Sequence, residues 1–223
     1  MQKITISDEL AAKVPELQLS CIYCDVTPVP INVQLWKLIL LKINEIASSI
    51  SVEQISHIPA IAASRKAYRA CGKDPARYRL SAEALLRRVV NRNELYQINN
   101  VVDALNLVSI STGFSIGGYD ADKIEGDIFF GIGRPGEPYA GIGRGELNIE
   151  GMPVFRDNIG AFGTPTSDSE RTSVSLETKR FLMIIIDYAT STQLTEATGF
   201  AKELLLKYTQ AANFDIKTIA NYP

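Results

Sequence analysis

Residues 97–113 have the sequence QINNVVDALNLVSISTG, in which asparagine and aspartate side chains interrupt an otherwise apolar helical pattern. Short polar side chains weaken a helix interior because they compete for backbone hydrogen bonds. Their presence on a core-facing helix predicts that they cap turns and anchor neighbouring backbone segments. We expect this helix over residues 98–112, ended by Gly113, because glycine suits the left-handed residue that closes a helix.

Helical patterns also precede this stretch. Apolar residues recur at helical spacing after Asn32, a suitable N-cap, and again over residues 58–71. Ser81 is the expected N-cap of a further helix. Short strands are expected at residues 4–6 and before the prolines at 28 and 30, since proline stops a helix there.

Short β segments are expected between residues 127 and 155, separated by glycine and proline as in hairpins. The sequence GIGR occurs at 131–134 and at 141–144, which we interpret as two strands that face each other across a turn. The remaining expected elements are a strand at 181–188, a helix at 192–211 and a strand at 214–219. This order predicts an α+β fold, a layered β-sandwich of mixed sheets with flanking helices.

The composition is that of an ordinary globular protein, with 223 residues, a net charge of −2 and 46% hydrophobic residues. We expect one domain over 1–223, with a β and helical part at 1–72 and the motif-bearing part at 73–223. The apolar run at 181–186 is far shorter than the roughly 20 residues of a membrane helix. No signal-like segment begins the sequence, so a cytoplasmic protein without membrane or DNA partners is expected.

Metal and redox chemistry is not expected. Cys21 and Cys24 lie on a strand-like alternation, and buried thiols are the favoured interpretation over a redox or metal pair. A closed zinc site is not expected from one histidine, His57, and three cysteines. Asp120 and Asp122 are typical of a turn and lack the spacing of a calcium loop. We expect no cofactor.

Arginines gather around the helix that starts near residue 81. Two interpretations stay open, a solvated helix face and a stripe that binds RNA phosphates, because charge alone does not separate them. The candidate RNA-binding residues are Arg77, Arg79, Arg87, Arg88 and Arg92.

Three blocks of sequence resemble a known family. INNVVDALN at 98–106 and GGYDADKIEG at 117–126 are similar, with matching spacing, to two motifs of the tRNA-editing domain (B3/B4 type) of the phenylalanyl-tRNA synthetase β subunit. SERTSVSLET at 169–178 resembles a third motif. The resemblance implies a β-sandwich with helical layers and a free-standing relative of the editing domain. It does not imply a synthetase, for which the chain is too short.

The resemblance also implies a site, with departures. The editing glutamate of the family falls on Glu170, whereas its pocket histidine falls on Gly117 and an arginine found in some members falls on Tyr96. We place Glu170 as the catalytic group that orients water or holds the substrate ammonium. The candidate substrate-binding residues are Asn100, Asn106, Gly117, Gly118, Thr172 and Ser173.

Three functions follow as hypotheses, with tRNA as the expected partner in the first two. One is a trans-acting hydrolase that deacylates mischarged tRNA such as tyrosyl-tRNA for phenylalanine. Another is a non-catalytic module that binds RNA or an amino-acid-like ligand, and the third is an unrelated enzyme on the same fold. A hydrolase requires Glu170 and Gly117 at one ester, so their placement in one concavity would favour the first.

Overall fold

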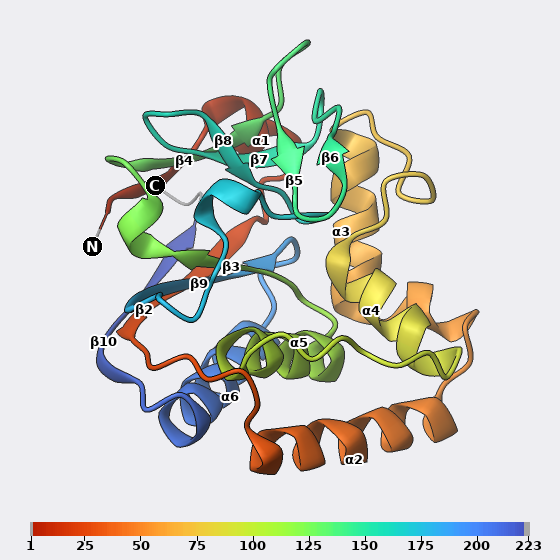
Figure 1. Cartoon of the computed structure of the whole chain (residues 1–223). Coiled ribbons are helices and arrows are strands. Elements are labelled where there is room, and N and C mark those ends of the chain that lie inside the picture. The colour runs from red at the N-terminus through yellow and green to blue at the C-terminus, as the bar shows by residue number, and fades with distance from the viewer. Residues whose placement is uncertain (1, 221–223) are drawn as a thin grey trace.

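The computed structural model describes residues 2–220 (Figure 1). Sheet A consists of β1 (Ile4–Ile6), β4 (Ile128–Ile132), β7 (Pro153–Arg156) and β8 (Ala161–Gly163), in that order. Sheet B has the order β10 (Ala212–Ala220), β2 (Gln18–Asp25), β9 (Arg180–Asp187) and β3 (Ser115–Asp120). A separate hairpin is formed by β5 (Ala140–Gly141) and β6 (Gly145–Glu146).

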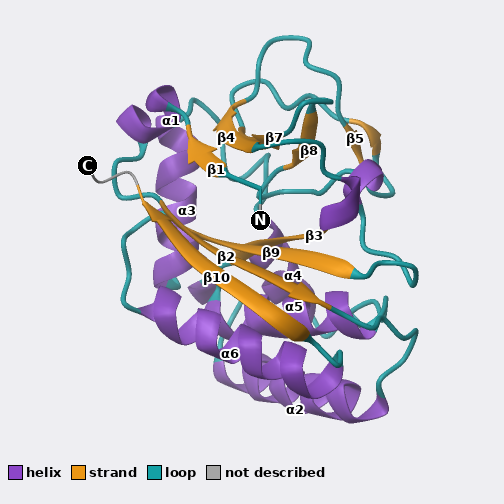
Figure 2. Ribbon diagram, turned by 90° about the vertical axis from the view of Figure 1, so that its left-hand side faces the viewer, coloured by secondary structure: helices purple, strands orange, loops and turns teal. Residues whose placement is uncertain are grey.

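Helices cover the face of sheet B that sheet A leaves open, so the molecule has layers of sheet, sheet and helix (Figure 2). This arrangement confirms the predicted α+β fold with layered sheets and flanking helices. The α-helices are α1 (Asp8–Lys13), α2 (Val33–Ser49), α3 (Pro59–Ala70), α4 (Ser81–Val90), α5 (Asn100–Thr112) and α6 (Gln193–Tyr208). Short 3-10 helices are η1 (Gln54–His57), η2 (Ala121–Lys123) and η3 (Glu170–Thr172).

Strand β9 is buried on both faces, which explains its unbroken apolar run. Ile184 and Ile186 belong to the core shared with sheet A, whereas Met183 and Ile185 belong to the core shared with the helices. Successive side chains of a strand point to opposite faces, so a strand between two layers needs apolar residues at every position.

The two cysteines of β2 lie in different cores. Cys21 packs between the sheets and Cys24 packs toward the helices, because they stand three residues apart on a strand. Burial raises the pKa of both thiols to about 12. The interpretation as buried, unpaired thiols is confirmed.

The helix ends follow the sequence signals closely. Asn32 caps α2, and Asn99 caps α5, where its side chain accepts hydrogen bonds from two backbone amides. Gly113 closes α5 with φ of 78°. Asp103 accepts a hydrogen bond of 3.0 Å from the amide of Ile98, and burial raises the pKa of its carboxyl group to about 6.

Asn100 accounts for the polar character of α5, because its buried amide joins three chain segments. Its Oδ1 accepts a hydrogen bond of 2.8 Å from the amide of Val29. Its Nδ2 donates to the carbonyl groups of Thr27 at 3.2 Å and Tyr208 at 2.7 Å. The side chain thus holds the end of α6 and the segment after β2 against α5.

The interpretation of the two GIGR copies as facing strands is wrong. The first copy runs out of β4, which pairs with β1 and β7, and the second runs from β5, which pairs with β6. In the first copy, a Cβ at Gly133 would lie 1.9 Å from the carbonyl oxygen of Ile149, so the glycine permits a close backbone approach.

The prediction of Ser81 as an N-cap is also wrong. Ser81 is the first residue of α4, and Leu80 is its N-cap.

We expect Asn100→Ala to lower the free energy of unfolding by about 2–4 kcal/mol, because it removes hydrogen bonds to three backbone groups. Of these groups only the carbonyl of Tyr208 keeps another side-chain donor among the described residues, Asn32. The measurement is urea unfolding followed by circular dichroism. Asn106→Ala is the matched control on the same helix, since its partly buried amide makes no hydrogen bond within residues 2–220. Equal losses in the two variants would contradict this role of Asn100.

Candidate functional site

Three buried tyrosines hold three consecutive residues of the segment after β8. The hydroxyl groups of Tyr68 and Thr166 share a hydrogen bond of 3.0 Å. Tyr139 donates to the carbonyl oxygen of Ser167 at 2.5 Å, and Tyr119 donates to the carboxylate of Asp168 at 2.9 Å. Burial raises the pKa of all three phenols, so each keeps its proton. We call residues 164–168 the clamped segment.

Tyr119 occupies the space that Gly117 leaves open. Both residues face sheet A, and a Cβ built on Gly117 would lie 2.1 Å from the Tyr119 hydroxyl oxygen. On the other side a Cβ at Gly163 would lie 2.2 Å from the same oxygen. The phenol therefore lies in a slot between two glycines, one from each sheet, and its ring packs edge-on against Phe162. Gly117 is the residue on which, by the resemblance, the pocket histidine of the family falls.

Asp168 is the carboxylic acid of the clamped segment, where it is bonded to Tyr119. Burial raises the pKa of its carboxyl group to about 7, although hydrogen bonds from the Tyr119 hydroxyl and the Gly118 amide favour the ionised form. The carbonyl oxygen of the same residue accepts a hydrogen bond of 2.9 Å from the amide of Ile142. Asp168 thus links β3 to the β5–β6 hairpin and titrates near neutral pH.

A cavity of about 520 Å³ lies beside the clamped segment, between the chain before α4 and the β5–β6 hairpin. Its wall carries the guanidinium groups of Arg77, Arg79 and Arg144 and one carboxylate, Glu146. None of these four side chains forms an ion pair among the residues that the structure describes. The cavity is also lined by Thr164, Thr166, Tyr78, Leu147, Ile149 and Met152.

The predicted arginine stripe is divided among three environments. Arg77 and Arg79 are exposed and line the cavity before α4. Arg87 pairs at 2.9 Å with Glu83, a carboxylate only 1% exposed that also binds Arg65. The last two, Arg88 and Arg92, line a different groove, beyond the other end of α4. The five side chains therefore do not form one continuous face.

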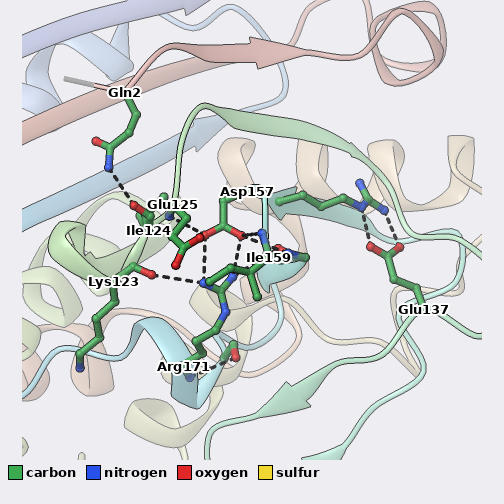
Figure 3. Close-up of polar contacts among 11 residues, drawn as sticks. Gln2, Lys123, Ile124, Glu125, Glu137, Asp157, Ile159 and Arg171 are labelled. Atoms are coloured by element: carbon green, nitrogen blue, oxygen red, sulfur yellow. Dashed lines mark hydrogen bonds and ion pairs between the residues drawn. The ribbon is translucent and has the colours of Figure 1, made fainter.

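The block that contains Glu170 is fixed by its neighbour Arg171 (Figure 3). Arg171 donates two hydrogen bonds of 2.9 Å to the carboxylate of Asp157 and one of 3.2 Å to the carbonyl oxygen of Lys123. Arg171 holds the pKa of the Asp157 carboxyl group below its ordinary value, against the effect of burial. Bidentate pairs of this kind fix geometry, so η3 is held firmly.

Glu170 itself is exposed and lies next to the β5–β6 hairpin, 3.5 Å from the amide nitrogen of Gly143. Ser173 donates its hydroxyl proton to the Glu170 carbonyl oxygen at 2.8 Å. Thr172 is fully buried, and its Oγ1 has no hydrogen-bond partner within residues 2–220. These three residues lie together, as the motif predicted.

The other predicted substrate residues lie elsewhere. Asn100 and Asn106 are on α5 in the helical layer, and a Cβ at Gly118 would meet Leu105 at 2.5 Å on that same side. Gly117 faces sheet A, beneath Tyr119. Glu170 and Gly117 therefore do not share an open concavity, and none of the seven predicted catalytic and substrate residues lines the 520 Å³ cavity. Their role at a substrate stays a prediction.

Sequence reasoning missed Asp168 and Glu146. Both lie in polar stretches where an acid is ordinarily solvated, and only the packing of sheet A against sheet B brings Tyr119 to Asp168. Within residues 2–220 no group of three His, Cys, Asp or Glu side chains is placed to hold a metal ion. Over the same residues no helix is long and apolar enough to cross a membrane.

These features define a layered α+β domain with a cationic cavity beside a tyrosine-held acid. A family model described as the B3/4 domain matches residues 63–209, which is well over half of the chain. The chain belongs to this family, and the resemblance drawn from the three motif blocks is confirmed at the level of the family.

The chain is similar to a solved structure, an N-terminal fragment of the phenylalanyl-tRNA synthetase beta-subunit from Pyrococcus horikoshii. The TM-score is 0.48 and the sequence identity is 15%, and the match covers 96% of the present chain and 50% of the Pyrococcus chain. The chain thus spans about half the length of that fragment. No curated protein matches the chain.

We expect the titration of Asp168 to be visible in stability. Between about pH 4 and pH 7 the folded protein retains a proton on Asp168 that the unfolded chain releases, so the free energy of unfolding decreases as pH rises through this window. Asp168→Asn keeps the acceptor for Tyr119 and removes the titration. The stability of wild type relative to the variant should therefore decrease from pH 4 to 7 and then level off. Parallel thermal unfolding profiles would contradict the assignment.

Proposed function

We propose that this B3/4 domain binds the aminoacylated 3′ end of a tRNA in the 520 Å³ cavity. The observation that carries the proposal is the set of three guanidinium groups, Arg77, Arg79 and Arg144, that line one cavity without carboxylate partners among the described residues. Unpaired arginines suit phosphate, because guanidinium binds phosphate oxygens with two parallel hydrogen bonds.

The rest of the wall suits the aminoacyl group. Glu146 offers a carboxylate for an α-ammonium group, and Leu147, Ile149 and Met152 offer apolar surface for a side chain. The hydroxyl groups of Thr164 and Thr166 lie on the same wall. Such a mixture of a few polar groups on an apolar lining is typical of ligand pockets. The identity of the ligand rests on the resemblance to the editing domain.

We expect the double substitution Arg77→Glu and Arg79→Glu to weaken tRNA binding. The Kd for aminoacylated tRNA should rise about tenfold or more, and the slope of log K against log salt should fall by about 1.4, since each single-stranded phosphate contact contributes roughly 0.7. Filter binding at several salt concentrations measures both quantities.

The charge-matched control is Lys202→Glu with Lys207→Glu on α6, two exposed lysines outside the cavity. This control should bind tRNA nearly as wild type does. A loss as large as that of the arginine variant would mean that net charge, not the cavity, governs the binding, and the proposal would fail.

Hydrolysis of the aminoacyl ester is a second candidate. Because Gly117 lies beneath Tyr119 and does not share a concavity with Glu170, this candidate rests on Glu170 alone. Its exposed carboxylate lies against the tip of the β5–β6 hairpin, whose continuation at residues 146–148 separates the 520 Å³ cavity from a neighbouring open one of about 680 Å³. Glu170 lines neither cavity, but its neighbours Ser169 and Arg171 line the open one. A carboxylate beside this cavity could accept a proton from an attacking water, because an activated ester needs no covalent nucleophile.

A panel of mischarged tRNAs, beginning with tyrosyl-tRNA for phenylalanine, tests this candidate. If Glu170 acts as general base, Glu170→Gln should reduce deacylation about 100-fold or more. Glu177→Gln, which removes another exposed carboxylate of the same block, should leave the rate unchanged. No turnover by the folded wild type on any member would reject hydrolysis and leave the binding function.

A further inference from the structure

A second groove, of about 540 Å³, lies in the helical layer between α2 and the chain at residues 88–97. One face of α2 contributes Trp36, Leu40 and Ile43 at helical spacing. The opposite wall contributes Arg88, Arg92 and Tyr96, together with one acidic residue, the exposed Glu94. No residue of the tRNA cavity described above lines this groove, so the two are separate sites.

Tyr96 presents an open aromatic face at the groove. The guanidinium carbon of Arg88 lies 4.3 Å from the centre of the Tyr96 ring, so Arg88 covers one face of that ring. The side chain is nevertheless 68% exposed, so the other face is open to solvent. A large aromatic side chain held in this way by an arginine is a stacking platform for a planar group.

The two arginines of the groove have no carboxylate partner within residues 2–220. Arg88 donates to the backbone carbonyl of Glu94, and Arg92 appears in no ion pair of the described chain. Arg92 also has φ of 56°, a left-handed conformation that costs energy in any residue with a side chain. It follows the C-cap of α4, where glycine is ordinarily favoured. In this conformation the amides of Arg92 and Asn93 donate to the carbonyl groups of Val89 and Arg88, which closes α4 and places Arg92 at the rim of the groove.

We infer that this groove binds a nucleoside monophosphate unit, free or as an unpaired residue of an RNA. The base stacks on the open face of Tyr96 above the apolar surface of Leu40 and Ile43, and the phosphate pairs with Arg88 and Arg92. A planar ring that carries an anionic phosphate matches an aromatic platform beside two guanidinium groups that have no carboxylate partner among the described residues. An aliphatic ligand without charge would form no ion pair with Arg88 or Arg92.

Trp36 is the one tryptophan of the sequence and lines the groove, so its fluorescence reports occupancy directly. The wild-type protein is titrated with each of four nucleoside monophosphates, with a single-stranded hexaribonucleotide, with adenosine and with inorganic phosphate. We expect saturable quenching by at least one nucleotide, a Kd about tenfold or more higher for adenosine, and no quenching by phosphate alone. Saturation by mononucleotides identifies a free nucleotide, and saturation by the hexamer alone identifies RNA.

Variants separate this site from the proposed tRNA cavity. Tyr96→Ala and Arg88→Ala should each raise the Kd about tenfold, whereas Tyr96→Phe, which keeps the aromatic face, should not. The Arg77→Glu and Arg79→Glu variant should retain the quenching, so failure of one site does not imply failure of the other. Tyr96 is exposed, and circular dichroism checks that each variant is folded.

Three results would overturn the inference. One is the absence of quenching by any nucleotide or by the hexamer with a folded protein. Another is equal affinity for adenosine and for its monophosphate, which would remove the arginines from recognition. The third is unchanged affinity in Tyr96→Ala, which would remove the stacking platform.

Discussion

The burial of β9 on both faces is the constraint on which the rest of the structure depends. A strand with apolar side chains at every position must be covered twice, so sheet B requires a layer on each side. Sheet A covers one face, and β1 joins it through β4. Strands β2 and β10 instead widen sheet B itself. The helices α5 and α6 then close the second face, where Asn100 holds them together.

The position of the clamped segment follows from this layering. Sheet A and sheet B approach closely enough at Gly117 and Gly163 for one tyrosine hydroxyl to lie between the two backbones. Tyr119 then reaches Asp168 past the edge of β3, and Tyr68 and Tyr139 hold the two preceding residues. A wall of the 520 Å³ cavity is thus attached to the rigid inter-sheet core. Groups held on rigid elements keep the geometry that a binding site needs.

Local signals predicted the parts of this fold that depend on local chemistry. The cap at Asn32 and the stop at Gly113 follow from the chain around each residue and lie where expected. Helix α5 begins two residues later than expected, with Asn99 as its N-cap, and the cap predicted at Ser81 is wrong. Strand β3 was not expected, because two adjacent glycines weaken a strand pattern. Side chains would collide there with the ring of Tyr119, which belongs to the same strand, and with Leu105 of α5. Likewise the GIGR repeat does not indicate which strands pair with one another, because tertiary packing decides strand pairing.

The candidate site shows the same division. Glu170, Thr172 and Ser173 lie together because they are neighbours in sequence, and their role at a substrate stays a prediction. The distribution of the arginines could not be predicted, since Glu83 is buried only in the folded protein and binds both Arg65 and Arg87. The paired carboxylate removes one arginine from the stripe and leaves unpaired arginines at each end of α4.

This separation has an electrostatic consequence. Helix α4 has ten residues and is therefore about 15 Å long, at roughly 1.5 Å per residue. The Debye length at physiological ionic strength is only about 8 Å, so exposed charges at one end of the helix have little effect at the other. With a net charge of −2 the whole chain provides no general attraction for polyanions. Under both proposals each group of arginines therefore recognises phosphate by direct contact, and a substitution at one end of α4 leaves the affinity at the other end nearly unchanged.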